Sequence, residues 1–442
     1  MPKSWQSVSI PRNDQSDEDV LANMPIAQAL KGADIAKLGS LLSSVLPGNP
    51  SVSELSIEKS VGEAFTGGRS TPVYCISCSI MRPKWSESRK RQFVAKLVEM
   101  PGNADYDGHL RKIRESYAIE RRFYDVAAPR IRDNLFGLQV EVPKLLASDR
   151  DGLRSHPAAC FLMNDVRQKG YTLHPNFLSV SQAKRALKWI ASFHSIFWND
   201  SKSEQWKRDL WERGGFWTGN KDSDNGADNK KITTNWSQNL RWLQSNHPDW
   251  LSDKTKGLGK RIQNISEPLN KFLLSESVGH RGTLLHGDYK AANLFFTDEL
   301  RNGSVHDALD IGAESVCAVD FQFTGAGVGA EDIAYLLFPD ARGHFEEHEE
   351  DLLRSYHDEL ILRLIEQRKG GPSSISFDTL HTHYQLSRLD FTRHLLGRGW
   401  VASTEGDALL IRSLERIMFQ IDGGKSLSDE NEYLEKLSQL IS

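Results

Sequence analysis

The chain has 442 residues, of which 39% are hydrophobic and 26% charged, and its formal net charge is −4. This composition is typical of a soluble globular protein with two or three packed units, because a single compact core does not grow to this length. The small negative charge gives no reason to expect nucleic acid or an anionic membrane as a partner. No apolar run approaches the roughly 20 residues that a membrane-spanning helix needs, so we expect no membrane span.

The amino-terminal 20 residues are polar and partly acidic, and this predicts disorder over residues 1–20. They contain neither the apolar core of a secretion signal nor the acid-poor character of an organelle-targeting peptide. We therefore expect a cytoplasmic protein. No feature of the sequence indicates an obligate protein partner.

Helical and strand-like patterns alternate over the first third of the chain. Apolar residues recur with helical spacing over Asp34–Leu46, which predicts a helix that ends at Pro47-Gly48. Three strand-like runs follow in close succession and predict an antiparallel meander with short turns. These runs cover Leu55–Phe65, Pro72–Ile80 and Gln92–Glu99, and they precede a predicted helix over Gly108–Val126 and two predicted strands over Leu138–Val142 and Ala158–Met163.

After Met163 the pattern becomes mainly helical. It predicts an amphipathic helix, a polar loop, a strand-turn-strand region and then helices to the end, with the first three over Ser181–Trp198, Gly219–Asn229 and Leu284–Phe323. We therefore predict an α+β fold with a small strand-rich lobe over residues 21–163. A larger, mainly helical lobe is predicted over residues 164–442.

The strongest chemical signal is LLHGDYKAANLFF, which places His286, Asp288, Lys290 and Asn293 in one short loop between apolar runs. A second signal, CAVDFQFTGAGVGAEDIAYLL, places Asp320 at the end of a predicted strand. Phosphoryl transfer needs hard oxygen ligands for magnesium and a carboxylate that orients the acceptor hydroxyl. Asn293 and Asp320 offer the ligands, and Asp288 offers the carboxylate.

These two motifs resemble those of a known fold. HGDYKAAN resembles the HxDxxxxN pattern of the protein-kinase-like fold, as used by aminoglycoside phosphotransferases and choline kinases. The stretch DFQFTGAGVGAEDIAYLL resembles the ecdysteroid kinase-like (CHK) branch, and its Asp-Phe-Gln stands where protein kinases carry Asp-Phe-Gly. The resemblance covers roughly residues 54–396. It implies a two-lobed kinase fold, with a small antiparallel-sheet lobe for the nucleotide and a helical catalytic lobe, and it implies the use of ATP and Mg²⁺.

The resemblance implies a role for each residue of the catalytic loop. Asp288 is the expected base, while Asn293 and Asp320 are the expected metal ligands. Lys290 matches the lysine that protein kinases carry two residues after the aspartate. It either neutralises charge on the transferred phosphate or is an exposed lysine. His286 is expected to pack and hydrogen-bond the loop, because Asp288 already fills the role of base.

Six further residues are expected to form the nucleotide site. Lys96 in QFVAKLVEM lies on the third predicted strand and would contact the phosphates, and Glu120 on the next helix would hold that lysine in place. Gly67 and Gly68 stand where this fold covers the phosphates, although a plain hairpin turn explains them almost as well. The backbone near Asn164 and Val166, in FLMNDV, would meet the edge of the adenine.

The predicted function is ATP-dependent phosphorylation of the hydroxyl group of a small molecule. A nucleotide-binding pseudokinase that acts as an interaction module is the main alternative. A protein kinase is disfavoured, because Asp320-Phe321 is not followed by glycine and no Ala-Pro-Glu segment occurs. Sterol-like, choline-like and other alcohols all stay open as the acceptor. Seven of the eleven tryptophans lie between Trp198 and Trp250, and this favours an apolar or cationic alcohol over a sugar.

Overall fold

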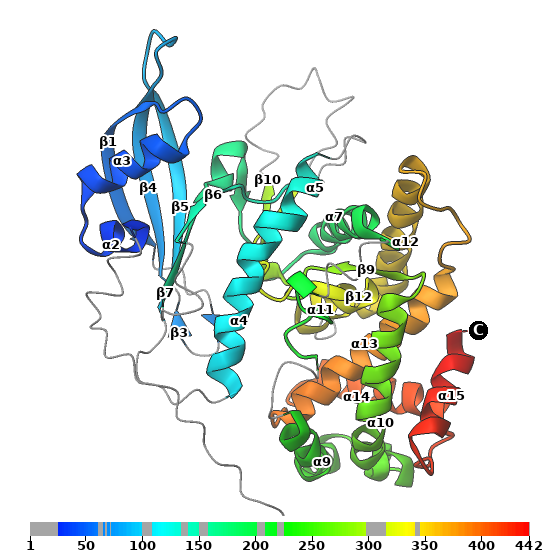
Figure 1. Cartoon of the computed structure of the whole chain (residues 1–442). Helices are drawn as coiled ribbons and strands as arrows, with labels where there is room; N and C mark the ends of the chain where they lie inside the picture. Colours follow the sequence, from blue (N-terminus) through cyan, green and yellow to red (C-terminus); the bar gives the residue numbers. More distant parts are fainter. Residues whose placement is uncertain are drawn as a thin grey trace, which may run out of the picture. The chain divides into compact units, whose positions relative to one another are not determined.

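The computed structural model describes residues 25–60, 65–66, 69–70, 72–99, 108–133, 140–149, 158–200, 208–218, 225–297, 315–340 and 345–441. The chain divides into two compact units, one of residues 1–103 with 145–165 and the other of residues 104–144 with 166–442 (Figure 1). The boundary predicted at residue 163 lies close to the third crossing, between residues 165 and 166, whereas residues 104–144, predicted to belong to the amino-terminal lobe, group with the second unit. The segment expected to be disordered, 1–20, lies outside the described residues.

The first unit is built on a five-stranded antiparallel sheet with the strand order β1-β4-β5-β7-β6. Its strands are β1 (Ser51–Ser60), β4 (Val73–Met81), β5 (Arg89–Glu99), β6 (Leu145–Ser148) and β7 (Ala158–Asn164). The predicted meander is present, because β4 pairs with both β1 and β5. The prediction of a strand over Leu138–Val142 is wrong for the described residues 140–142, where only Glu141 forms an isolated bridge. The strand β6 begins after Pro143, which cannot donate a hydrogen bond to a neighbouring strand.

Two short helices cover one face of this sheet, α2 (Pro25–Lys31) and α3 (Ile35–Val45). The predicted helix α3 begins as its sequence suggests, because the carboxylate of Asp34 accepts a hydrogen bond from Lys37 N at 2.9 Å. Leu38 and Leu42 of this helix are buried against apolar residues of β4, β5 and β7. A small hairpin, β2 (Phe65–Thr66) with β3 (Arg69–Ser70), flanks Gly67 and Gly68, which lie outside the described residues.

The second unit begins with one helical stretch of three parts. The helix α4 (Gly108–Arg122) continues into a π-helical turn η1 (Phe123–Ala127) and then into α5 (Ala128–Arg132). The predicted helix over 108–126 therefore exists, but its last turn is widened.

Most of the second unit is helical (Figure 1). Its helices are α7 (Val180–Phe197), α9 (Asn225–Asn246), α10 (Asp253–Val278), α11 (Ala330–Asp340), α12 (Glu349–Glu366), α13 (Phe377–Gly397), α14 (Glu405–Asp422) and α15 (Glu430–Ile441), with the short turns η2 (Val166–Lys169), η3 (Pro248–Trp250), η4 (Ala291–Asn293) and η6 (Glu346–His348). The amphipathic helix predicted over 181–198 is α7, which begins at a capping box formed by Ser179 and Gln182. The polar loop predicted over 219–229 is shorter, because α9 already begins at Asn225.

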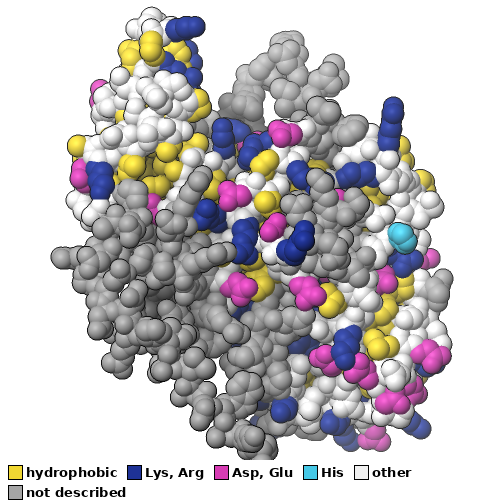
Figure 2. All heavy atoms as spheres, in the orientation of Figure 1, with side chains coloured by type: hydrophobic (Ala, Val, Ile, Leu, Met, Phe, Trp, Pro, Cys, Tyr) yellow, Lys and Arg dark blue, Asp and Glu magenta, His cyan; other side chains and the backbone are white. Residues whose placement is uncertain are grey.

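Two small sheets lie among these helices. One has the order β11-β10-β8 and the other pairs β12 with β9, where the strands are β8 (Tyr171–Leu173), β9 (Gly282–Leu285), β10 (Leu294–Thr297), β11 (Val316–Ala318) and β12 (Gly325–Val328). Within the described part of the chain, no helix is both long and apolar enough to cross a membrane. On the face drawn in Figure 2, basic and acidic side chains are interspersed over the described surface.

Candidate active site

Strand pairing brings the two predicted motifs together. The loop 286–293 connects β9 to β10, and the turn 319–324 connects β11 to β12. β9 pairs with β12, and β10 pairs with β11. Both connections therefore run between the same two small sheets and lie next to each other. Val319 N donates to Asn293 O at 3.0 Å, which joins the two segments directly.

Asp288 is held in a buried position by its own loop, with 4% of its surface exposed. Asn293 Nδ2 donates to Asp288 Oδ2 at 3.0 Å and to its backbone carbonyl at 2.8 Å. Lys290 Nζ lies 3.1 Å from Asp288 Oδ2. Burial raises the pKa of the Asp288 carboxyl above its usual value, the charge of Asp320 raises it further, and Lys290 opposes the rise. A buried carboxylate of raised basicity beside a lysine is therefore the centre of this site.

His286 has both ring nitrogens engaged by backbone groups. Its Nε2 lies 3.1 Å from Val319 O, and its Nδ1 accepts from Asp288 N at 3.3 Å. The ring is fully buried, and this burial lowers its pKa. A neutral imidazole with both nitrogens bonded to the backbone supports the loop and is not arranged to carry a proton to substrate.

Asp332 of α11 braces the start of the catalytic loop. Its carboxylate accepts from His286 N at 2.8 Å and from Gly287 N at 2.9 Å, and it is itself held by His194 Nε2 at 3.1 Å. Gly287 has a φ of +83°, and a Cβ at this position would lie 2.0 Å from Phe323 O. Asp332 therefore braces the loop that carries Asp288.

His194 is a core residue of the amphipathic helix α7. It is fully buried, and its Nδ1 lies 2.8 Å from the hydroxyl of Tyr356 on α12. The chain of contacts from Tyr356 through His194 to Asp332 therefore supports the catalytic loop from the interior of the second unit.

Asp320 adopts an unusual backbone conformation, with a φ of +70°. Left-handed φ values are uncommon for residues other than glycine and cluster at functional sites. The next residue, Phe321, is fully buried and stacks on Phe123 of the π-helical turn, with 3.7 Å between ring centroids. Gln322 Nε2 donates to Asp320 Oδ2 at 3.3 Å.

The donor set of this site fits a magnesium ion. Asp320 offers a half-buried carboxylate. The amide nitrogen of Asn293 is turned toward Asp288, so the Oδ1 atom of Asn293 can serve as a metal ligand. Among the described residues, no group of three or more His, Cys, Asp or Glu side chains could hold a metal ion. Magnesium suits such a sparse site, because it is commonly held by one or two carboxylates together with water and phosphate oxygens.

The residues expected to bind the nucleotide fall in both units. Lys96 lies on β5 with 6% of its surface exposed, and Glu120 lies on α4 with 1% exposed. Lysine and glutamate are rarely buried to this degree unless they are paired, so neither is a solvated surface residue. Asn164 ends β7 in the first unit, and Val166 begins η2 in the second.

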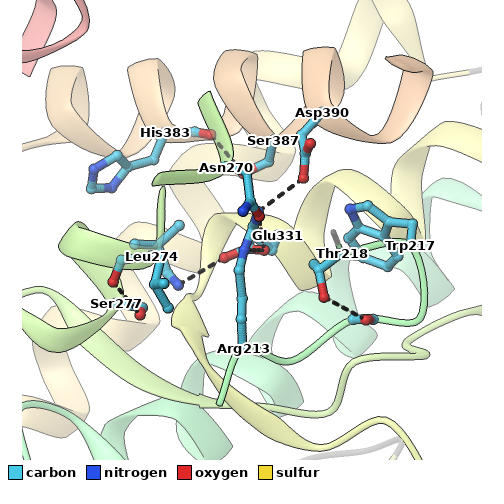
Figure 3. Close-up of polar contacts among 12 residues, drawn as sticks. Arg213, Trp217, Thr218, Asn270, Leu274, Ser277, Glu331, His383, Ser387 and Asp390 are labelled. Atoms are coloured by element: carbon cyan, nitrogen blue, oxygen red, sulfur yellow. Dashed lines mark hydrogen bonds and ion pairs between the residues drawn. The ribbon is translucent and has the colours of Figure 1, made fainter. Parts of the chain in front are cut away.

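The segment 211–218 lies along the catalytic loop, and no sequence motif predicted this position. Phe216 N donates to Gly287 O at 3.2 Å, and Gly215 N donates to Phe323 O at 3.1 Å. The segment is anchored by Arg213, a buried arginine that points into the helical core (Figure 3). Only the glycine pair in WERGGFWT hinted at a close approach of two backbones.

Arg213 contacts three side chains from three different helices. Its Nη2 lies 2.8 Å from Glu331 Oε2 and 2.9 Å from Asp390 Oδ2, and its Nη1 donates to Asn270 Oδ1 at 2.6 Å (Figure 3). Asp390 is also paired with Arg393 at 2.9 Å. The network therefore contains two buried cations and two buried anions, and it ties the segment 211–218 to α10, α11 and α13.

Comparison with known proteins identifies the family of this chain. A family model described as ecdysteroid kinase-like matches residues 70–368, which is more than half of the sequence. The chain belongs to the ecdysteroid kinase-like family. This places it among kinase-like small-molecule phosphotransferases and confirms the α+β, protein-kinase-like fold that the two motifs implied.

Solved structures of several kinases are similar to this ecdysteroid kinase-like protein. A microcompartment-associated aminopropanol kinase has 14% identity and a TM-score of 0.43, and the match covers 94% of this chain and 98% of that chain. A putative aminoglycoside phosphotransferase from Ralstonia eutropha JMP134 has 15% identity and a TM-score of 0.40, with coverage of 91% and 97%. Choline kinase LicA from Streptococcus pneumoniae has 13% identity and a TM-score of 0.33, with coverage of 84% and 98%. No curated protein gave a significant match.

The tryptophans of this family member mainly build its core. Of the seven between Trp198 and Trp250, four are buried and two are half-buried, while Trp206 lies outside the described residues. Trp217 packs with Tyr335 and Phe391 in an aromatic cluster. Trp211 donates from Nε1 to Gln322 O at 3.0 Å and is therefore the tryptophan tied to the Asp320 turn.

Proposed function

We propose that the protein transfers the γ-phosphoryl group of ATP to the hydroxyl group of a small molecule, with Mg²⁺ as the metal. The observation that carries this proposal is the buried Asp288, which shares one loop with Lys290 and Asn293 and lies beside Asp320. Family membership supports the general class of reaction. A pseudokinase, the main alternative, has no need of a buried carboxylate of raised basicity.

Each residue of the loop has a defined task in this proposal. Asp288 Oδ orients the acceptor hydroxyl and takes its proton, and burial makes this carboxylate a stronger base than a free aspartate. Lys290 offsets negative charge next to Asp288. Asn293 and Asp320 would hold the metal. When bound, Mg²⁺ supplies positive charge that offsets the charge developing on the phosphate oxygens.

The residues proposed to bind the nucleotide are those that the family resemblance implies. Lys96 would bind its phosphates, Glu120 would hold that lysine, and Gly67 and Gly68 would cover the phosphates. The backbone near Asn164 and Val166 would meet the adenine.

The acceptor is proposed to be an apolar or cationic alcohol. Phe216 supports this class, because its backbone N–H donates to Gly287 O of the catalytic loop and its ring is half-buried. Its ring also contacts Phe323 at 5.9 Å and Tyr335 at 5.2 Å between centroids. Aromatic faces bind apolar ring systems and quaternary ammonium groups better than they bind polar sugars.

The proposal is tested by incubating the purified full-length protein with ATP labelled at the γ-phosphate and a library of hydroxylated metabolites. We expect label transfer to a sterol-like, amino or other alcohol in Mg²⁺, and none in EDTA. Transfer to protein substrates alone would show a protein kinase. Binding of ATP without transfer to any member of a broad library, and without hydrolysis, would favour the pseudokinase.

Asn293→Ala is expected to raise the magnesium concentration needed for half-maximal activity by about tenfold, because one of the proposed metal ligands is lost. The measurement is initial rate against Mg²⁺ at saturating ATP. Asn235→Ala is the matched control, because Asn235 also donates from its amide to a carbonyl, that of Leu396, but belongs to α9. An unchanged magnesium requirement in Asn293→Ala would remove this residue from the metal site.

Lys96→Met is expected to weaken the use of ATP by about tenfold or more while the protein stays folded, because a long uncharged side chain fills the same buried position. Glu120→Gln should show a milder defect of the same kind. Lys90→Met, an exposed position on the same strand, is the control. The measurement is the KM for ATP together with thermal unfolding. A normal KM in Lys96→Met would contradict its placement at the phosphates.

A further inference from the structure

Gln322 joins three parts of the second unit through its side chain and its backbone. Ser116 Oγ on α4 donates to Gln322 Oε1 at 3.2 Å, and Gln322 Nε2 donates to Asp320 Oδ2 at 3.3 Å. Its backbone carbonyl accepts from Trp211 Nε1 at 3.0 Å. Gln322 has only 2% of its surface exposed, so water competes little for these bonds.

Among side chains of this length, only the glutamine amide can both accept a hydrogen bond from Ser116 and donate one to Asp320. Its carbonyl accepts from the serine while its nitrogen donates to the aspartate. A glutamate would still accept from Ser116, but it would place a second negative charge against Asp320. A glycine, which protein kinases carry at this point of the motif, could form neither bond.

The helix at the other end of the link is itself fixed to the same unit. Lys112 Nζ donates to Phe216 O at 2.7 Å, and Arg122 Nη1 donates to Asp209 O at 3.3 Å. Just after α4, Phe123 stacks on Phe321, the residue between Asp320 and Gln322. A displacement of α4 would therefore act on the Asp320 turn through two contacts, a ring stack and the Gln322 amide.

We propose that Gln322 is a positioning residue that couples α4 to the proposed metal ligand Asp320, an inference that rests on the proposed function. Asp320 has the strained φ of +70°. Gln322 Nε2 holds one oxygen of its carboxylate, and the bond from Ser116 Oγ fixes the position of the Gln322 amide. The helix that carries Glu120 and the residue that binds the metal are thereby held in one arrangement.

The test compares three variants of the full-length protein with Asp320→Ala, which removes the proposed metal ligand itself. Gln322→Leu removes both bonds at similar volume, Gln322→Glu keeps only the bond to Ser116, and Ser116→Ala removes only the bond to the helix. Ser387→Ala is the matched control, because Ser387 is buried to the same 1% and its Oγ also donates to a neighbouring group, the carbonyl of His383. ATP binding is measured by calorimetry with and without Mg²⁺, and activity is measured against Mg²⁺ concentration.

We expect Gln322→Leu and Gln322→Glu to reduce the magnesium-dependent gain in ATP affinity by about tenfold, and Ser116→Ala by about threefold. ATP affinity in EDTA and the thermal midpoint of Ser116→Ala should match those of the Ser387→Ala control. Wild-type magnesium dependence in Gln322→Leu, while Asp320→Ala loses it, would overturn the positioning role and leave the proposed function in place. Wild-type dependence in Asp320→Ala as well would overturn the proposed metal site itself.

Discussion

Asp288→Asn should lower turnover by at least about 100-fold, the lower range for a positioned acid–base group. The change keeps the shape of the side chain and its burial, but it removes the negative oxygen that orients the acceptor hydroxyl and takes its proton. Lys290 would then lie beside a neutral amide, while Asn293 Nδ2 would keep its bond to the backbone carbonyl of residue 288 and would keep its side-chain acceptor only if the new amide turns its oxygen toward it. Steady-state turnover with an identified acceptor measures the effect.

Measuring nucleotide binding by Asp288→Asn distinguishes loss of the base from loss of the folded structure. Asp288→Asn should bind ATP with Mg²⁺ about as well as the wild-type protein and unfold at a similar temperature. A matched change at an exposed aspartate, Asp253→Asn, should leave turnover unchanged. Turnover near the wild-type rate in Asp288→Asn would exclude the carboxylate as the base.

Arg213→Met should lower the free energy of unfolding by about 3–5 kcal/mol, the cost of removing one partner from a buried ion pair. Burial raises the pKa of the Glu331 carboxyl, and Arg213 is the nearest charge that opposes this rise. For Asp390, Arg393 and Arg213 together outweigh burial and lower the pKa of its carboxyl. Without Arg213, Glu331 loses its only cation shown in the network and Asp390 keeps one of two.

Urea unfolding followed by tryptophan fluorescence gives the measurement. Arg354→Met is the control, because Arg354 pairs with Glu350 on the exposed surface of α12, where an ion pair contributes at most about 0.5 kcal/mol. Arg213→Lys should fall between the two, because one ammonium group cannot replace a planar guanidinium that reaches three partners. A loss of less than about 1 kcal/mol in Arg213→Met would show that the network adds little to stability.

The parts of the site that were predictable from the sequence are those encoded within a few residues. The sequence predicted that Asp288 and Asn293 share one short loop, and the structure adds that the amide of Asn293 lies 3.0 Å from the Asp288 carboxylate. The same holds for the meander of the first sheet, where short turns join strands that pair in sequence order. Local pattern is enough in both cases.

The parts that sequence reasoning missed depend on partners that are distant in the chain. Gln322 bonds to Ser116 across 206 positions, and Arg213 bonds to Asp390 across 177. Arg213 belongs to no motif, and the Asp-Phe-Gln motif that contains Gln322 gives no sign of its bond to Ser116. The π-helical turn after α4 was missed for a related reason: its local pattern is that of an α-helix, and its last turn packs against Phe321 of the distant Asp320 turn.

The support of the catalytic loop by Asp332 also has a consequence for the order of folding. Its bonds to His286 and Gly287 span 46 and 45 positions, its bond to His194 spans 138, and the next bond, from His194 to Tyr356, spans 162. Closing such long loops is slow, because their chain entropy is lost before the contacts form. The full set of contacts that supports the loop between β9 and β10 therefore exists only when α7, α11 and α12 are docked together. During synthesis, the residues that define the chemistry emerge well before Tyr356, so the site is completed only after α12 has left the ribosome.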